Sequence, residues 1–204
     1  MRLTPGIVLT MMLAVCAPAA PAGVDTRPDH RPLRWEEPWA SWTPAPAERP
    51  DPFDPFKAWR PADDLAVTFG GRGRLRVEHS TGAGFGAPRN DDDTFLLSQL
   101  RLHADVRAGE HLRFFAEGIA AHAGDRDLPG GRRAVDVNSA DLLNGFADLA
   151  LPLGDDATLT LRGGRQQLLF GRGRLLAPHD WLNAPHTFDG GRAILDLPTW
   201  RLEG

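Results

Sequence analysis

The chain has 204 residues with 42% hydrophobic composition, which is enough for one ordinary domain. Its net charge of −4 favours neither a nucleic-acid partner nor a long acidic tail. Cys16 is the only cysteine, so an internal disulfide is excluded.

The first residues have the features of an export signal. Arg2 is followed by the short apolar run Ile7–Ala17, which is far below the roughly 20 residues that a membrane-spanning helix needs. An A-x-A pattern ends at Ala22, so residues 1–22 are predicted to be a cleaved signal peptide. The alternative is a lipoprotein signal that ends at Cys16. Both interpretations take the chain out of the cytoplasm.

Residues 23–62 are predicted to form a proline-rich linker. Eleven of the 18 prolines lie within residues 18–62, and proline at this density blocks helix interiors and strand ladders. We expect an extended, poorly packed segment. Its four tryptophans are unusual in a free linker, so they either rest on the part that follows, at its rim or in its mouth, or form a partner-binding motif. They are Trp35, Trp39, Trp42 and Trp59.

From Leu65 onward the hydrophobic pattern has a period of two, which is typical of β-strands with one apolar face. The expected strands are Leu65–Glu78, Leu96–Arg107, Leu112–Ala120, Leu143–Leu151, Thr158–Gly164 and Phe188–Leu197, with a seventh strand beginning near the C-terminus. The first is about 14 residues long, well above the five or six of an ordinary soluble strand.

The connections between these strands alternate between long and short. Long, polar segments follow the first, third and fifth strands, and tight turns follow the others. A transmembrane β-barrel has this asymmetry, whereas a soluble β-sandwich, the alternative, would not need a long connection at every second position. Six strands cannot close the smallest outer-membrane barrels, which have eight. We therefore expect residues 63–204 to be an antiparallel transmembrane β-barrel in part: about six to seven strands at the N-terminal end of a larger barrel.

The stretch Gly164–Gly190 carries a series of short motifs. They read GRQ at 164–166, FG at 170–171, RL at 174–175, DW-x-N at 180–183 and FDG-x-R at 188–192. This ordered series resembles the alginate-export family of bacterial outer-membrane β-barrels, and a weaker similarity extends back to about Leu65. The resemblance implies a location in the outer membrane of a Gram-negative bacterium and arginines along the path of a uronic-acid polymer.

Alternation places a charged set of side chains on the face that would line the lumen of a barrel. The candidate path-lining residues on the strands are Arg72, Arg74, Arg76, Arg101, Arg113, Glu117, Asp148 and Arg162, accompanied by Glu78, His103 and Asp105. A planar guanidinium binds carboxylates in bidentate fashion, and a ring of such charges selects anions. The alternative is that these charges pair with one another and only hold water.

Arg165 is a further candidate with an ambiguous direction. Strict alternation from Gly163 points it toward lipid, whereas its place in the family motif implies a role in the path, which a local bulge would allow. Arg174, Asp180 and Asn183 fall in the long loop that follows. Folded inward, this loop would constrict the pore; otherwise it would pair only its own charges.

No motif for catalysis or cofactor binding stands out. The acidic run Asp91–Asp93 is interpreted as a solvated loop tip, with a calcium site as the alternative. His179 and His186 lack a third partner at metal-ligand spacing. We therefore expect no enzyme activity, no metal and no cofactor; a hydrolase carried on a barrel scaffold is the competing interpretation.

The expected function is a porin-like channel for export or passage of an anionic, alginate-like polysaccharide. The expected partners are outer-membrane lipid, the polysaccharide or another hydrophilic solute, and periplasmic secretion proteins. Two alternatives stay open: a general porin for small solutes, and a soluble exported β-sandwich that binds carbohydrate.

Overall fold

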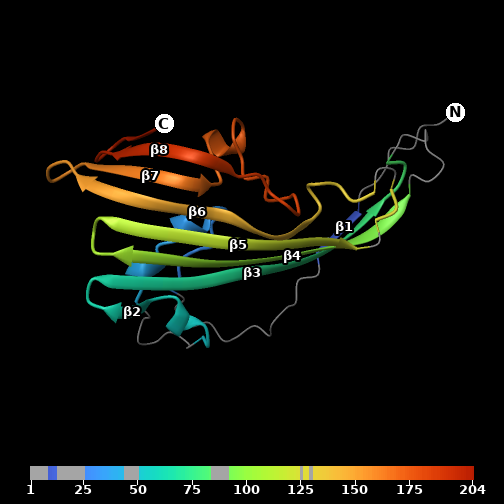
Figure 1. Cartoon of the computed structure of the whole chain (residues 1–204), viewed down its shortest axis with the longest axis horizontal. Coiled ribbons are helices and arrows are strands. Elements are labelled where there is room, and N and C mark those ends of the chain that lie inside the picture. Colours follow the sequence, from blue (N-terminus) through green and yellow to red (C-terminus); the bar gives the residue numbers. More distant parts are fainter. Residues whose placement is uncertain (1–8, 13–25, 44–50, 84–91, 125, 129–130) are drawn as a thin grey trace.

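The structure is a computed structural model that describes residues 9–12, 26–43, 51–83, 92–124, 126–128 and 131–204. Its dominant feature is one antiparallel sheet in which successive strands are neighbours (Figure 1). The strands are β1 Leu9–Met12, β2 Trp59–Ala62, β3 Leu65–Ser80, β4 Asp93–Ala108, β5 Leu112–Gly124, β6 Asn138–Pro152, β7 Thr158–Gln166, β8 Phe188–Asp196 and β9 Arg201–Glu203. Short 3₁₀ helices are η1 Arg34–Glu36, η2 Trp39–Ser41, η3 Asp54–Phe56 and η4 Gly171–Gly173.

The predicted fold class is confirmed. All six expected long strands are present, and β9 supplies the short seventh one. The described strands form a single sheet, so the β-sandwich alternative is wrong. The sheet is open, because its order runs linearly from β1 to β9 and no described pairing joins its two edges. Two short strands were not expected: β2 lies in the predicted linker and β1 in the predicted signal peptide, and both pair with β3.

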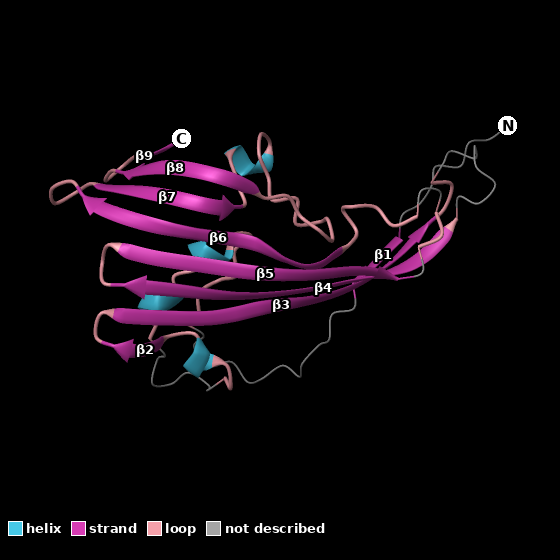
Figure 2. Ribbon diagram, in the orientation of Figure 1, coloured by secondary structure: helices cyan, strands magenta, loops and turns pink. Residues whose placement is uncertain are grey.

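The alternation of connections is also present. Tight turns join β4 to β5, β6 to β7 and β8 to β9 at one end of the sheet, and the long connections leave from the opposite ends of the strands (Figures 1 and 2). Gly109 and Gly154 sit in two of these turns with φ of 60° and 77°, a conformation that glycine adopts without steric cost. We call the two ends the short-turn end and the long-loop end.

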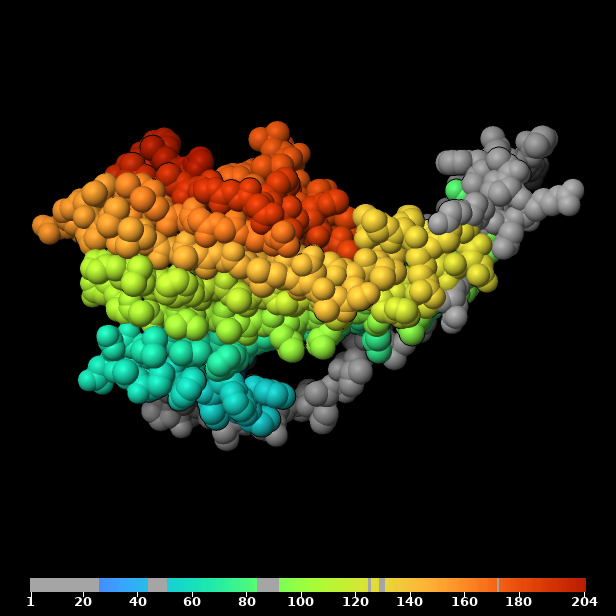
Figure 3. Space-filling view, viewed as in Figure 1, coloured from blue at the N-terminus to red at the C-terminus, as the bar shows by residue number. Residues whose placement is uncertain are grey.

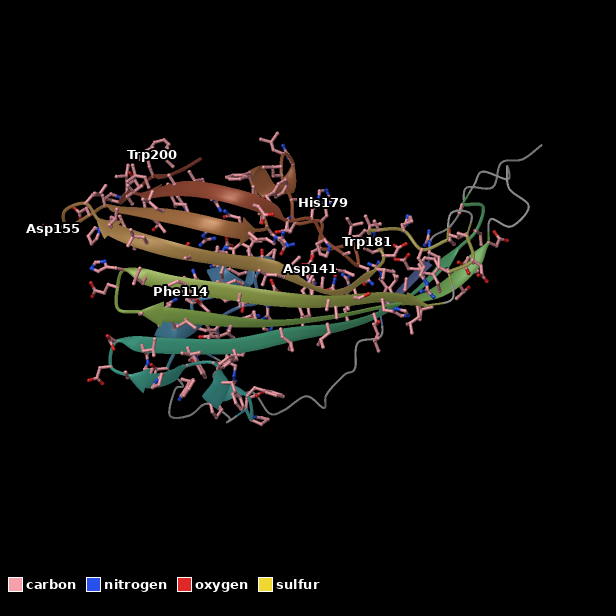
Figure 4. All side chains as sticks on the ribbon, viewed as in Figure 1. Phe114, Asp141, Asp155, His179, Trp181 and Trp200 are labelled. Atoms are coloured by element: carbon pink, nitrogen blue, oxygen red, sulfur yellow. The ribbon has the colours of Figure 1, made fainter. Side chains whose placement is uncertain are left out.

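The two faces of the sheet differ in chemistry. One face, here the outer face, carries many exposed apolar side chains, and Phe114 stands on it in Figure 4. Its large exposed residues include Leu75, Leu100, Leu102, Phe114, Leu149 and Leu161. The opposite, inner face carries buried polar and charged side chains, among them Gln99, Arg101, Asp105 and Arg162. This apolar-out, polar-in alternation is the pattern of a barrel wall.

Two segments cover the inner face. The first is residues 26–43, here the N-terminal segment, in which Leu33, Trp35, Trp39 and Trp42 are buried. The second is residues 167–187, here the crossing loop, which joins β7 to β8. We expected the proline-rich segment to be poorly packed, but this part of it packs on the sheet because Trp35 inserts against Phe115 and Phe146.

Small apolar clusters lie on the inner face toward the long-loop end. Phe95 and Leu97 pack with Ala123 and with Leu128 of the connection between β5 and β6. The register of β6 shifts between Asn144, opposite Glu117, and Leu142, opposite Gly118. This irregularity leaves Leu143 and Asn144 both buried. Among the described residues, no helix is long and apolar enough to cross a membrane.

Candidate functional site: an arginine wall held by a crossing loop

The six strand arginines predicted to share a face do share it. β3 provides Arg72, Arg74 and Arg76, and β4, β5 and β7 provide Arg101, Arg113 and Arg162. Glu78, His103, Asp105, Glu117 and Asp148 lie on the same face and are buried. Direct ion pairs between these side chains show that they are neighbours, for example Arg113 with Asp105 and Arg162 with Asp148. We call this set of six arginines the arginine wall.

Asp180 of the crossing loop binds two arginines of the wall. Its carboxylate accepts hydrogen bonds from Arg72 at 2.7 and 2.8 Å, and an Arg101 Nη2 atom lies 2.9 Å from Asp180 Oδ1. Burial by itself would raise the pKa of Asp180. The hydrogen bond from Arg72 and the charges of Arg101 and Arg74 outweigh it and hold this pKa below 3.8, its ordinary value. Asp180 is therefore ionised at neutral pH, and the pairs persist.

The crossing loop is also held through its main chain. Arg74 donates to the carbonyl oxygens of Asp180 at 2.7 Å and Leu182 at 2.9 Å. Arg76 donates to the Trp181 carbonyl at 2.7 Å, and its guanidinium lies 4.1 Å from the centre of the Trp181 ring. Figure 4 shows Trp181 far from Asp155, which marks the short-turn end. Folding of this loop onto the wall is what the inward alternative predicted.

Asn183 fixes the loop where it meets the sheet. Its side chain is 1% exposed, and Nδ2 lies 2.8 to 3.1 Å from the carbonyl oxygens of Ser98, His122 and Asp136. The Gln99 amide donates to the Asn183 carbonyl at 2.7 Å. This side chain thus joins β4, β5 and the connection between β5 and β6. The DW-x-N motif therefore has a structural reason: its Asp and Asn side chains and its Trp carbonyl each bind the inner face.

A second group of charges lies toward the short-turn end. Arg113 donates two hydrogen bonds of 2.8 Å to Asp105. Arg162 donates hydrogen bonds of 2.7 and 2.8 Å to Asp148, and its guanidinium lies 3.7 Å from the centre of the Phe146 ring. Beside them is a pocket of about 420 Å³. It is lined by five arginines and two glutamates, together with Trp35, Leu169 and Ile194. The charged residues are Arg31, Arg113, Arg162, Arg192, Arg201, Glu36 and Glu203.

Arg74 differs from the other five wall arginines. Each of the others has a carboxylate oxygen within 4.0 Å, from Asp180, Glu78, Asp105 or Asp148. Arg74 has none among the described residues and meets only neutral oxygens. Its charge is the least compensated of the wall.

Arg165 does not join the wall. Pairing is continuous from Gly163 through Arg165 with both β6 and β8, so no bulge turns the side chain inward. Arg165 lies on the outer face and binds Asp189 at 2.8 and 3.0 Å. The motif-based prediction that Arg165 lines the path is therefore corrected, because its side chain points away from the inner face. Arg174 is exposed at the start of the crossing loop, and among the described residues its side chain has no hydrogen-bond or ion-pair partner.

Several residues of the site were not singled out from the sequence. Alternation predicts that the Gln99 side chain lies on the inner face, but it does not predict the hydrogen bond from Gln99 to the crossing loop. Asp136 contributes a carbonyl oxygen, for which residue type carries no signal. The described residues contain no cluster of three side chains able to hold a metal. Asp92 and Asp93 instead accept hydrogen bonds from the main-chain N–H groups of Gly82 and Asp127, while Asp91 lies outside the described residues.

An antiparallel sheet with an exposed apolar face, a charged inner face and alternating short and long connections defines the class of outer-membrane β-barrel walls. A family model described as alginate export matches residues 65–204, which is more than half of the chain, and the chain belongs to that family. The family consists of outer-membrane transport proteins. No curated protein and no solved structure matches the chain.

Proposed function

We propose that this chain forms the wall of an outer-membrane channel through which an anionic polysaccharide of the alginate type passes. The observation that carries the proposal is the arginine wall, because six guanidinium groups from four strands share one face. A uronic-acid polymer presents one carboxylate per sugar, and a planar guanidinium fork matches that group. No covalent step is involved, so the protein would act only by binding and releasing the polymer.

Passage would proceed by exchange of partners. In the structure the wall arginines bind Asp180, Glu78, Asp105 and Asp148, so an entering carboxylate competes with groups of the protein. Buried Nε atoms of Arg72, Arg74, Arg76 and Arg101 have no hydrogen-bond partner among the described residues. Because these atoms are buried, they would donate to a solute carboxylate only after the guanidinium groups turn. Because every wall arginine except Arg74 is shared with an internal carboxylate, binding would be weak enough for release, as conduction requires.

A general porin for small solutes is the second candidate. The observation that favours it is the same pairing of most wall arginines, which reduces the net positive charge of the path. The two candidates differ in ion selectivity, since a polyanion path must prefer anions. Arg74 is the side chain to test, because no carboxylate of the described residues lies against it.

Arg74→Glu is expected to lower the ratio of anion to cation permeability about threefold at 0.01 M salt and less at 1 M, because screening shortens the reach of the charge. The measurement is the reversal potential of the complete gene product in planar bilayers under a salt gradient. Arg132→Glu is the matched control, since Arg132 is an exposed residue of a long connection. Equal effects of the two substitutions, or none for Arg74→Glu in a folded barrel, would contradict the anionic path.

We further propose that a signal peptide of residues 1–22 exports the chain and that the long connections face the cell exterior. Thiol labelling of intact cells tests both points, in a background where Cys16 is replaced by serine. Ala83→Cys, in the connection after β3, should react with a membrane-impermeant reagent, and Asp155→Cys, in a tight turn, should react only after the outer membrane is opened. Reaction of Asp155→Cys alone would reverse the orientation, and no reaction at either site in folded protein would reject export.

A further inference from the structure

The N-terminal segment lies on the inner face and occupies the half of the sheet near the short-turn end. Figure 2 shows its short helices beside the halves of the strands that end in tight turns. In Figure 3, which shows the outer face of β3 to β6, no atoms of residues 26–43 are in view. The crossing loop covers another part of the same face, over Arg72, Arg74 and Arg76.

Trp35 anchors the segment on wall residues. It is 4% exposed, and its ring meets Phe115 and Phe146 edge-on at centroid distances of 5.4 and 5.2 Å. Arg113 donates to the Trp35 carbonyl at 2.6 Å, and the Arg162 guanidinium lies 5.6 Å from the Trp35 ring centre. Trp35 therefore covers part of Arg113 and Arg162, and both side chains also line the pocket beside it.

The segment keeps its shape through its own contacts. The buried Glu37 carboxylate accepts hydrogen bonds from the Arg31 main chain at 3.0 Å, the Trp39 indole at 2.8 Å and the Arg34 guanidinium at 2.6 Å. Trp39 packs edge-on against Trp42 at 5.5 Å. These contacts lie within residues 26–43, so the segment can move as a unit.

Attachment to the sheet has a different character. The segment has no strand ladder with β4 to β8, whose described pairings are all with one another, with β3 or with β9. It is held by the Trp35 anchor, by the ion pair of Arg27 with Asp54 at 2.9 Å and by a hydrogen bond from Arg60 of β2 to the Ala40 carbonyl. Lys57, which lies 4.9 Å from the Trp39 ring and whose carbonyl accepts a hydrogen bond from Thr68, adds a further contact. Side-chain contacts of this kind can be broken without disrupting the sheet, whereas a ladder strand cannot leave alone.

We propose that residues 26–43 form a plug that closes the short-turn half of the path and leaves when solute passes. The proposal rests on the proposed function for the identity of the solute, but the plug itself predicts a change in simple salt conductance. Displacement uncovers Phe115 and Phe146 and widens the access to Arg113 and Arg162, because Trp35 contacts all four.

The test uses the complete gene product in planar bilayers with potassium chloride as the probe. Trp35→Ala and deletion of residues 26–43 should raise the mean conductance several-fold. Trp59→Ala is the matched control, since Trp59 lies half-exposed on β2, stacked on Phe69, and should leave conductance unchanged. Heat-modifiable migration on gels shows whether each barrel is folded.

Thiol accessibility provides a second readout. Phe115→Cys, combined with Cys16→Ser, should react slowly with a hydrophilic reagent added from the side of the tight turns. Its rate should rise more than roughly tenfold when Trp35 is also changed to alanine, because the ring that packs against position 115 is then absent. Unchanged conductance and an unchanged rate in folded protein would show that the segment is a static brace and would overturn the plug.

The two proposals fail separately. If Trp35→Ala raises the conductance but neither the unchanged channel nor this variant prefers anions, the plug is supported and the polyanion path is rejected. If the channel prefers anions and the deletion changes nothing, the path stands and the plug falls.

Discussion

Replacement of Asn183 by alanine is expected to release the crossing loop from the inner face and to lower the free energy of unfolding by about 3 kcal/mol. Three carbonyl oxygens, of Ser98, His122 and Asp136, lose their shared donor in this variant. A buried acceptor left unpaired costs about 1–3 kcal/mol, and water admitted through the loosened loop recovers part of that cost. The stability is measured as the urea midpoint of the folded, heat-modifiable form in detergent.

Release of the loop has a second consequence. Asn183 and Asp180 hold the same stretch of chain, so its departure frees the Arg72 and Arg101 guanidinium groups. The anion preference of the channel should then rise, because a carboxylate leaves the wall while both cations stay. Asn183→Ala should thus lower the free energy of unfolding and raise the anion preference of the channel.

The control is Asn138→Ala at the start of β6. Among the described residues, the Asn138 side chain has only a 3.5 Å hydrogen bond to Asp141, so its loss should change the free energy of unfolding by less than about 0.5 kcal/mol. Equal midpoints for the two variants would mean that Asn183 does not fix the loop. A lowered midpoint with unchanged anion preference would mean that the loop stays on the wall by its arginine contacts alone.

The sheet could be predicted from the sequence because its cause is local. The alternation from Leu65 to Val77 fixes which side chains of β3 share a face, and the same rule places Arg101, Arg113 and Arg162 on the wall. Turn chemistry at Gly109 and Gly154 fixes the hairpins. Each of these signals lies within a few residues of the structure that it determines.

The two segments that cover the arginine wall, which are the N-terminal segment and the crossing loop, could not be predicted in the same way. Arg72 and Asp180 are 108 residues apart in sequence, and nothing in their local pattern says that they meet. Trp35 stands in a proline-rich stretch whose composition indicates an open chain, yet the burial of its ring between Phe115 and Phe146 outweighs that tendency. Arg165 shows the converse: alternation gave its correct direction, and the motif alone would have turned it inward.

Gly164→Ala is expected to prevent formation of the native barrel in most of the protein. Gly164 has φ of 134°, a region that residues with a side chain rarely adopt, and a Cβ there would lie 2.3 Å from the Gly145 carbonyl oxygen and 2.8 Å from Phe146 Cα. Both atoms belong to the backbone of β6 and cannot move without breaking the ladder that pairs Gly164 with Phe146. Backbone strain of about 1–3 kcal/mol adds to the clash.

Gly163→Ala is the matched control one residue earlier on the same strand. An added Cβ at Gly163 meets no atom within 4 Å, and its φ carries no strain, so the folded fraction should stay near that of the unchanged chain or rise slightly. The fraction of heat-modifiable protein in outer-membrane extracts measures both variants. If Gly164→Ala folds as well as Gly163→Ala, then β7 does not approach β6 as closely as its pairing indicates. The position of Arg162 on the wall, two residues away, would then lose its support as well, because the same pairing places Arg162 opposite Asp148.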